Sequence, residues 1–183
     1  GVVDSSPAFA PYYIALHKYQ ENNFWVYAGL TDVQAFTDSH EGEITRTASD
    51  YTMASFGRWS SCAFNSLFVL NNGSDAPQLW SPPSVSTLLI DLTNWPASTT
   101  RKVMRSFSKF LVALGVTKSG VIYDSMVKWS HSADSGVPSS WDETSATKDA
   151  GEINLWDTPD KLVDCLPLGG VNMLYKENST YLM

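Results

Sequence analysis

Two residues near the start of the chain, His17 and Asp32, are of the types that pair in acid–base catalysis. An imidazole can take a proton from a hydroxyl, and a carboxylate can hold the imidazole in the tautomer that this transfer requires. A structural explanation fits the same residues. His17 can end a strand and hydrogen-bond a neighbouring carboxylate or carbonyl group, and Asp32 can be an ordinary turn residue.

A second group of these residue types, His131, Ser132 and Asp134, lies in a polar segment rich in Ser, Asp and Thr, about 130–151. Adjacent positions in a flexible loop rarely hold the geometry that catalysis needs, so we do not expect a catalytic triad there. The segment is predicted to be an exposed, flexible loop. Within it, Trp141 either presents an exposed indole to a receptor, a sugar or a lipid surface, or pins the loop to the body of the domain.

Other motifs that would bring in a cofactor or a metal ion do not occur. The sequence has no glycine-rich phosphate loop, GxSxG motif, HExxH motif or calcium-binding loop. The two cysteines, Cys62 and Cys165, lack the CxxC spacing of a zinc site, and we expect both to be reduced core residues. We therefore expect neither a cofactor nor a metal.

Length and composition favour a single globular domain over residues 1–183. The chain is 43% hydrophobic and 13% aromatic, so it can bury one sizeable core. No apolar run approaches the roughly twenty residues of a membrane-spanning helix, and the first residues do not have the pattern of a signal peptide. The formal net charge of −7 argues against a nucleic-acid partner, because neutralising phosphates requires a surplus of Lys and Arg.

The pattern of aromatic and β-branched residues predicts an antiparallel sheet. Residues 12–17 and 24–28 are short strand-like runs separated by a turn at 20–23. The series of expected strands continues through 43–46, 51–56, 63–70, 87–92, 120–129, 153–156, 162–166 and 171–175. Residues 71–74 (Asn-Asn-Gly-Ser) predict a tight turn, because Asn and Gly tolerate positive φ.

One stretch, about 99–114, has the periodicity of an amphipathic helix. Its apolar residues form a single stripe at a 3.6-residue period: Val103, Met104, Phe107, Phe110, Leu111 and Leu114. Ser98 or Thr99 could cap its start, and Gly115 suits the position after its end. The predicted fold is therefore α+β, a twisted antiparallel β-sheet with this one main helix packed on it. Four basic residues lie off the stripe and form either a solvated face or a patch for an acidic glycan or lipid headgroup: Arg101, Lys102, Arg105 and Lys109.

The N-terminal part of the chain resembles a known family. Segment 10–17 contains Pro-Tyr-Tyr followed by His17, and segment 22–32 runs from an Asn-containing turn through an aromatic strand into Gly29 and Asp32. This pattern is similar to the C-terminal protruding domain of iflavirus capsid proteins, the type found in slow bee paralysis virus and deformed wing virus. The likeness continues more weakly through 62–64, 87–92 and the segment after Trp95-Pro96, over about two thirds of the chain.

The resemblance implies a domain on the virion surface, made in the host cytoplasm, that acts in host-cell attachment or entry. Its partners would be the rest of the viral capsid and a host-cell receptor, whether protein, glycan or lipid, contacted by Trp141 and Lys18. In these domains a His directly followed by Ser, with an Asp further on, forms a proposed Ser-His-Asp site, which maps onto His17 and Asp32. Here Lys18 follows the histidine, so the nucleophile is missing from its place.

Another serine would have to supply the hydroxyl, and Ser55, Ser60 and Ser61 are the candidates on nearby predicted strands. The alternative function is a serine-hydrolase-like enzyme, such as an esterase, lipase or protease. A serine-directed fluorophosphonate probe distinguishes the two, because it labels an active hydrolase and leaves a binding module untouched.

Overall fold

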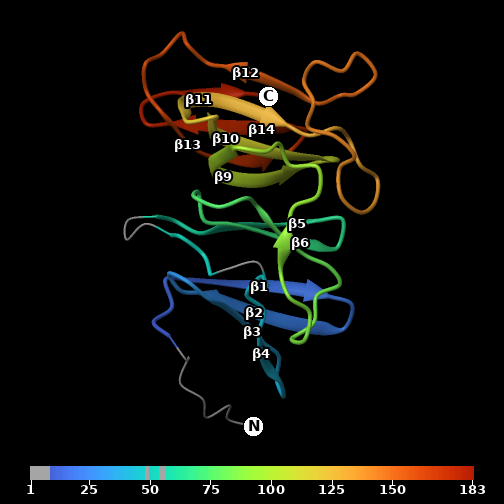
Figure 1. Cartoon of the computed structure of the whole chain (residues 1–183). Helices are drawn as coiled ribbons and strands as arrows, with labels where there is room; N and C mark the ends of the chain where they lie inside the picture. Colours follow the sequence, from blue (N-terminus) through green and yellow to red (C-terminus); the bar gives the residue numbers. More distant parts are fainter. Residues whose placement is uncertain (1–8, 48–49, 54–56) are drawn as a thin grey trace.

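The computed structural model describes residues 9–47, 50–53 and 57–183 (Figure 1). In these residues all regular secondary structure is β-strand, and turns and loops join the strands. Fifteen strands form four antiparallel sheets, and each sheet pairs consecutive strands in chain order. No helix long and apolar enough to cross a membrane occurs in the described part.

The first sheet contains β1 (Tyr13–Tyr19), β2 (Asn22–Ala28), β3 (Val33–Phe36) and β4 (Glu41–Glu43). The second contains β5 (Ser60–Phe64), β6 (Leu67–Asn71), β7 (Gln78–Trp80) and β8 (Ile90–Asp91). The third contains β9 (Thr99–Phe107), β10 (Phe110–Lys118), β11 (Val121–Trp129) and β12 (Gly151–Asn154). The fourth contains β13 (Leu162–Leu168), β14 (Val171–Lys176) and β15 (Thr180–Leu182).

The four sheets pack face to face in chain order; in Figure 1 the first sheet lies at the bottom, and the third and fourth overlap at the top. Three separate apolar cores lie between them, because successive residues of a strand point to opposite faces. On β6, for example, Phe68 and Leu70 join the first core while Val69 joins the second. On β10, Leu111 joins the second core and Val112 the third. The two middle sheets are therefore buried on both faces.

The first strands of successive sheets, β5, β9 and β13, lie side by side. Consecutive antiparallel meanders that stack face to face with their first strands together have the arrangement of the blades in a β-propeller. The second, third and fourth sheets are thus arranged like successive blades, and the fourth has three strands.

The predicted α+β fold is wrong, because residues 99–114 form most of the β9–β10 hairpin and not a helix. Phe107 pairs with Phe110 across a tight turn in which Ser108 has a φ of 52°. Strand β10 is buried on both faces, so its unbroken apolar run supplies the residues that looked like a helical stripe. Gly115 does have positive φ, 62°, but it lies inside β10 where the register with β11 shifts.

Several other expectations can be compared with the strands. The hairpin over 12–28 is confirmed as β1 and β2, and the turn at 71–74 is confirmed with a φ of 84° at Gly73. The single strand expected over 63–70 is wrong: β5 and β6 form a hairpin whose turn residues Asn65 and Ser66 both have positive φ. Residues 51–53 form no strand, and 54–56 lie outside the described residues.

The segment 130–151 contains no strand before Gly151, and most of its residues are exposed or half-buried. Ser130, Trp141 and Ala150 are buried along it. The two cysteines are free thiols, and burial raises the pKa of Cys165 to about 11. That thiol is therefore almost entirely protonated at neutral pH.

Candidate functional site

His17 is a buried histidine in an apolar environment. Its side chain lies on the inner face of β1, 3% exposed, with its ring centroid 5.2 Å from that of Phe68. Its Nε2 atom has no hydrogen-bond partner among the described residues. Burial lowers the pKa of His17, and a hydrogen bond with the backbone of Ser66 only partly opposes that shift. The ring is therefore held neutral.

Asp32 does not meet His17. His17 pairs with Phe24 near one end of β2, whereas Asp32 belongs to the turn after Ala28 at the other end. The 28 − 24 = 4 residue steps between these positions span about 13 Å of strand at the usual rise. The carboxylate of Asp32 instead accepts a hydrogen bond from Thr31 Oγ1 at 2.5 Å.

The candidate nucleophiles do not reach His17 either. Ser60 Oγ accepts hydrogen bonds from Asn71 Nδ2 at 3.1 Å and from the backbone N–H of Met104 at 3.5 Å. Ser61 Oγ hydrogen-bonds Tyr13 OH at 2.8 Å. Ser55 lies outside the described residues. Across the described part of the chain, the three roles of a Ser-His-Asp site are not brought together.

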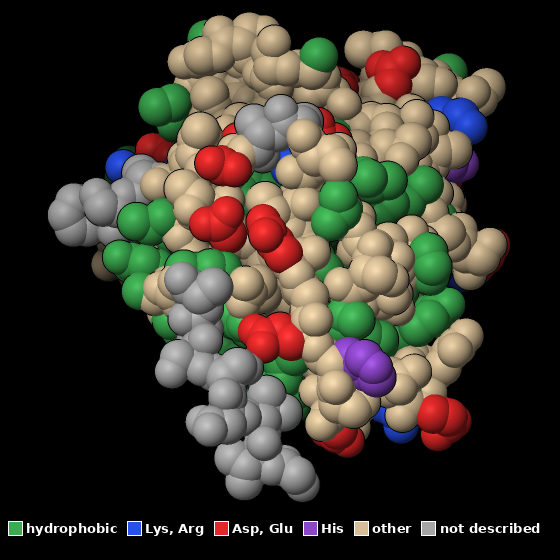
Figure 2. Space-filling view, turned by 60° about the horizontal axis from the view of Figure 1, so that its bottom comes forward, with side chains coloured by type: hydrophobic (Ala, Val, Ile, Leu, Met, Phe, Trp, Pro, Cys, Tyr) green, Lys and Arg blue, Asp and Glu red, His purple; other side chains and the backbone are tan. Residues whose placement is uncertain are grey.

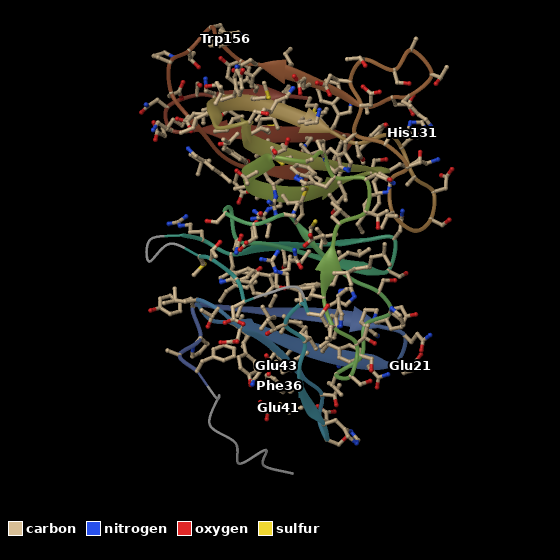
Figure 3. All side chains as sticks on the ribbon, in the orientation of Figure 1. Glu21, Phe36, Glu41, Glu43, His131 and Trp156 are labelled. Carbon is tan, nitrogen blue, oxygen red and sulfur yellow. The ribbon has the colours of Figure 1, made fainter. Side chains whose placement is uncertain are left out.

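The second His-Ser cluster is assembled with a different acid from the one expected. His131, labelled in Figure 3, accepts a hydrogen bond at Nδ1 from the backbone N–H of Asp149 at 3.0 Å. Ser132 Oγ donates to Asp149 Oδ2 at 2.6 Å. Asp134 pairs with Lys109 at 2.5 Å. Because the serine contacts the carboxylate and not the imidazole, the nucleophile–base contact of a hydrolase is missing here too.

The neutral, buried state of His17 predicts a pH dependence of stability. Because its folded-state pKa is lowered, the unfolded chain binds more protons as pH falls below the ordinary histidine value of about 6.5. The free energy of unfolding should therefore decrease between pH 7.5 and pH 5.5. In urea denaturation His17→Phe should flatten this slope, and the exposed-site control His40→Gln should keep it. Equal slopes in wild type and His17→Phe would contradict the assignment.

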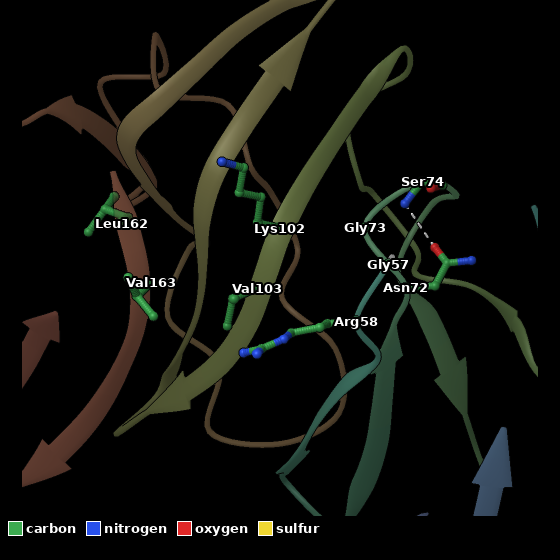
Figure 4. Close-up of a pocket in the computed structure, with 9 residues that line it drawn as sticks. All are labelled: Gly57, Arg58, Asn72, Gly73, Ser74, Lys102, Val103, Leu162 and Val163. Carbon is green, nitrogen blue, oxygen red and sulfur yellow. Dashed lines mark hydrogen bonds between the residues drawn. The ribbon is translucent and has the colours of Figure 1, made fainter. Parts of the chain in front are cut away.

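A pocket of about 350 Å³ opens where the second, third and fourth sheets meet (Figure 4). Its walls come from the segment before β5, the β6–β7 turn, β9 and β13: Gly57, Arg58, Asn72, Gly73, Ser74, Lys102, Val103, Leu162 and Val163. β9 and β13 are first strands of their sheets, so the pocket lies along the line where the first strands come together. In propeller-like folds this line is the central axis.

Arg58 is the cation of this pocket that no acid neutralises. Its side chain is exposed, has no hydrogen bond or ion pair with the described residues, and reaches across the pocket towards Val103 of β9 (Figure 4). Lys102 and Lys161 share one carboxylate, Asp124, to which Lys161 Nζ lies at 3.3 Å. The hydrogen bond from Lys102 lowers the pKa of Asp124, which keeps it charged.

The formal charge around the pocket is positive. The two charged side chains that line it, Arg58 and Lys102, are both cations, and the carboxylate that pairs with Lys102, Asp124, also pairs with Lys161. The formal net charge of the whole chain is −7, so the charge lining the pocket has the opposite sign from that of the chain. Val103, Leu162 and Val163 add an apolar wall. Such a pocket can hold a small anionic group, a carboxylate, sulfate or phosphate, that is attached to a partly apolar body.

The opposite rim of the pocket is fixed by the β6–β7 turn. Asn72 Oδ1 accepts hydrogen bonds from the backbone N–H groups of Ser74 at 3.0 Å and Asp75 at 2.9 Å. The side chain thus closes the turn on itself, as Asn side chains do in tight turns. Gly73 has the positive φ, 84°, that this turn requires.

The four basic residues that were predicted to lie on one helix face, as a solvated face or a basic patch, are dispersed over the β9–β10 hairpin. Arg101 is 1% exposed and lies 5.3 Å from the centre of the Trp95 ring. Arg105 binds both carboxylate oxygens of Asp164 at 2.8 and 2.9 Å. Of the four residues, only Lys102 lines the pocket. Sequence reasoning also missed Arg58, because no motif surrounds it.

The two residues expected to contact a receptor lie elsewhere. Trp141 is 2% exposed and packs edge-on against Trp95, 4.7 Å between ring centroids, so it pins the loop to the body and is not a surface contact. Lys18 is exposed on β1, outside the pocket. No cluster of three or more His, Cys, Asp or Glu side chains able to hold a metal ion occurs in the described ranges.

Comparison of the sequence with models of protein families and with curated proteins finds no match. The resemblance to the protruding domain of iflavirus capsid proteins thus remains a hypothesis that rests on the sequence pattern alone.

Proposed function

We propose that this chain is a recognition module that binds a single acidic group of a glycan in the Arg58 pocket. On a virion surface, where the sequence resemblance would place it, the module would act in host-cell attachment. The observation that supports the proposal most strongly is the guanidinium of Arg58, which has no partner among the described residues and faces a pocket of net positive charge. Arg is well suited to hold a carboxylate or sulfate through paired hydrogen bonds.

The charge of the whole chain restricts the ligand to a short one. A net charge of −7 repels long polyanions, so nucleic acid and densely charged polymers are poor partners. A single acidic sugar avoids that repulsion, because only its own charge has to enter the positive pocket. Its ring can lie against the apolar wall formed by Val103, Leu162 and Val163.

The hydrolase alternative gains no support from the geometry. His17 is buried beside Phe68, and its Nε2 atom contacts no hydroxyl of the described residues. Ser132 hydrogen-bonds Asp149 instead of the imidazole of His131. A binding function needs neither contact.

Arg58→Gln should weaken binding of a sulfated disaccharide by about 10- to 100-fold, because a hydrogen bond to a charged group contributes about 1.5–3 kcal/mol. Lys102→Gln should weaken it less, since Lys102 already shares Asp124 with Lys161. The matched control is Lys18→Gln, which removes an exposed cation outside the pocket. NMR titration against the disaccharide measures all four proteins.

The same variants test the biological role. Isolated chain should compete with virions for host cells, and Arg58→Gln should lose that competition while Lys18→Gln retains it. Equal disaccharide affinity in wild type and Arg58→Gln would overturn the pocket as the ligand site. Disaccharide binding without any competition at the cell surface would overturn the attachment role alone.

A further inference from the structure

Lys102 lines the Arg58 pocket, but its ammonium group points away from it. Its Nζ atom donates a hydrogen bond to Asp124 Oδ1 on β11, and the two groups form an ion pair. In Figure 4 the side chain runs across the third sheet, away from Arg58. Lys102 therefore belongs to the pocket wall, while its charge is held at a carboxylate on another strand.

Gly115 allows Lys102 to take this position. Gly115 lies in β10, between Lys102 of β9 and Asp124 of β11, where the register with β11 shifts. A Cβ atom on residue 115 would lie 2.9 Å from Cδ and 3.1 Å from Cγ of Lys102. The aliphatic part of Lys102 thus crosses β10 directly over a residue that has no side chain. The position is built into the β9–β10 hairpin and is not a chance contact of a free surface lysine.

A second lysine competes for the same carboxylate. Lys161, the residue before β13, has its Nζ atom 3.3 Å from Asp124 Oδ2. Two cations thus share one negative charge, and each weakens the hold of the other because like charges repel. The side chains of Lys102, Asp124 and Lys161 are 47%, 28% and 55% exposed, so both ion pairs have the modest strength of surface pairs. Lys102 can leave Asp124 easily, because Lys161 still balances the carboxylate.

We propose that Lys161 is a positioning residue for the Arg58 pocket, which controls how readily Lys102 turns from Asp124 to a bound anion. This inference rests on the proposed function and adds a means of control to the same site. In the empty pocket Lys102 lies over Gly115 against Asp124. When an acidic group binds Arg58, the flexible four-carbon stem of Lys102 lets its ammonium group turn into the pocket, and Lys161 retains the carboxylate of Asp124.

A simple effect of charge predicts a different pattern. Removing a cation near the pocket lowers its attraction for an anion, and removing the charge of Asp124 raises it. Under that explanation Lys161→Gln would have the same effect whether or not Asp124 is charged, as expected for independent sites. In the proposed exchange Lys161 acts only through Asp124, so its effect disappears once residue 124 is neutral.

A double-mutant cycle with the sulfated disaccharide separates the two explanations. Lys161→Gln should weaken binding by about two- to fivefold, the range of an exposed ion pair, because Asp124 then holds Lys102 more strongly. Asp124→Asn should tighten binding by a similar factor, because it releases Lys102. Adding Lys161→Gln to Asp124→Asn should leave the affinity of the single Asp124→Asn variant unchanged. NMR titration measures all four proteins.

Lys18→Gln is the matched control for the loss of a cation. Lys18 is exposed on β1 of the first sheet, outside the pocket. Figure 2 brings this sheet forward and shows Asp and Glu side chains more prominently than Lys and Arg on that face. Lys18→Gln should leave disaccharide binding unchanged, because Lys18 does not contact Asp124.

A second measurement needs no ligand. An acetylating N-hydroxysuccinimide ester modifies the free amine of Lys102 only when it leaves Asp124, and peptide mass spectrometry gives the rate. Lys161→Gln should slow this modification and Asp124→Asn should speed it, each by about two- to fivefold. The rate at Lys18 in the same samples should stay constant.

Two results would overturn the proposal. Equal effects of Lys161→Gln with and without Asp124→Asn would leave a simple effect of charge, and an unchanged modification rate of Lys102 in both variants would show that Lys102 does not exchange. Failure of the proposed function has a different signature. Wild type and Arg58→Gln would then bind the disaccharide equally, while the modification rates of Lys102 would still change as expected and support its two positions.

Discussion

Replacing Trp141 with alanine should lower the free energy of unfolding by about 3–5 kcal/mol, the usual cost of truncating a buried Trp or Phe. Trp141 is among the largest fully buried side chains, and it belongs to the core between the second and third sheets. Its loss would also free the segment 130–151 from Trp95. For a chain of this size the melting temperature should fall by roughly 10 °C, measured by calorimetry.

Two further variants make this test specific. The indole N–H of Trp141 is buried without a hydrogen-bond partner among the described residues, so Trp141→Phe loses no hydrogen bond and should cost much less than alanine. Trp156→Ala removes an indole that is 76% exposed and should leave the melting temperature within a few degrees of wild type (Figure 3). A Trp141→Ala variant as stable as wild type would show that the loop is not anchored by this residue.

The strands could be predicted from the sequence wherever one face of a sheet is polar. In β1 and β2 the turn at Gln20 and Glu21 separates two clear runs, and the predicted hairpin is the one observed. The prediction failed for β10, because Leu111 to Val116 are all buried and show no alternation. A continuous apolar run fits a helix or a doubly buried strand equally well. The hairpin turn at Ser108 and Lys109 lacks the Gly or Asn that would have indicated it.

The candidate site was less predictable than the fold. Arg58, the β6–β7 turn, Lys102 and β13 come together only because the first strands of three sheets converge. That convergence depends on the stacking order of the sheets, which local sequence patterns do not encode. The His17–Asp32 pair failed for the same reason: the register of β1 on β2 places the two residues at opposite ends of a strand.

The buried Lys128 shows how strongly the polar loop is held to the third sheet. Its side chain is 1% exposed, and its Nζ atom lies 2.5 Å from Glu143 Oε2 in the loop and 3.0 Å from Glu152 Oε2 on β12. Lys118 contacts the same two glutamates at 2.9 and 2.8 Å. Burial alone would raise the pKa of Glu143, but the hydrogen bonds from Lys128 and Lys118 lower it to about 2.

Lys128→Met should therefore destabilise the chain by about 3–5 kcal/mol at pH 7, because it leaves two partly buried carboxylates with one shared cation. Lys118→Met is the matched control: the Lys118 side chain is 33% exposed, so its loss is compensated by water and should cost less. Urea denaturation at pH 7 measures both variants, and equal costs would contradict the assignment of Lys128 as the buried centre of the network.

The same network determines whether the folded chain gains or loses stability as pH falls. A carboxyl group whose folded-state pKa is lowered stabilises the folded chain above its ordinary pKa of about 4.5, and that contribution is lost as pH falls towards 2. Wild type should therefore lose stability between pH 5 and pH 2, and Lys128→Met should lose less over the same interval, because Glu143 is then less strongly held in its charged form. Urea midpoints measured at pH 5, 3.5 and 2 test this, and parallel curves for the two proteins would show that Lys128 does not set the pKa of Glu143.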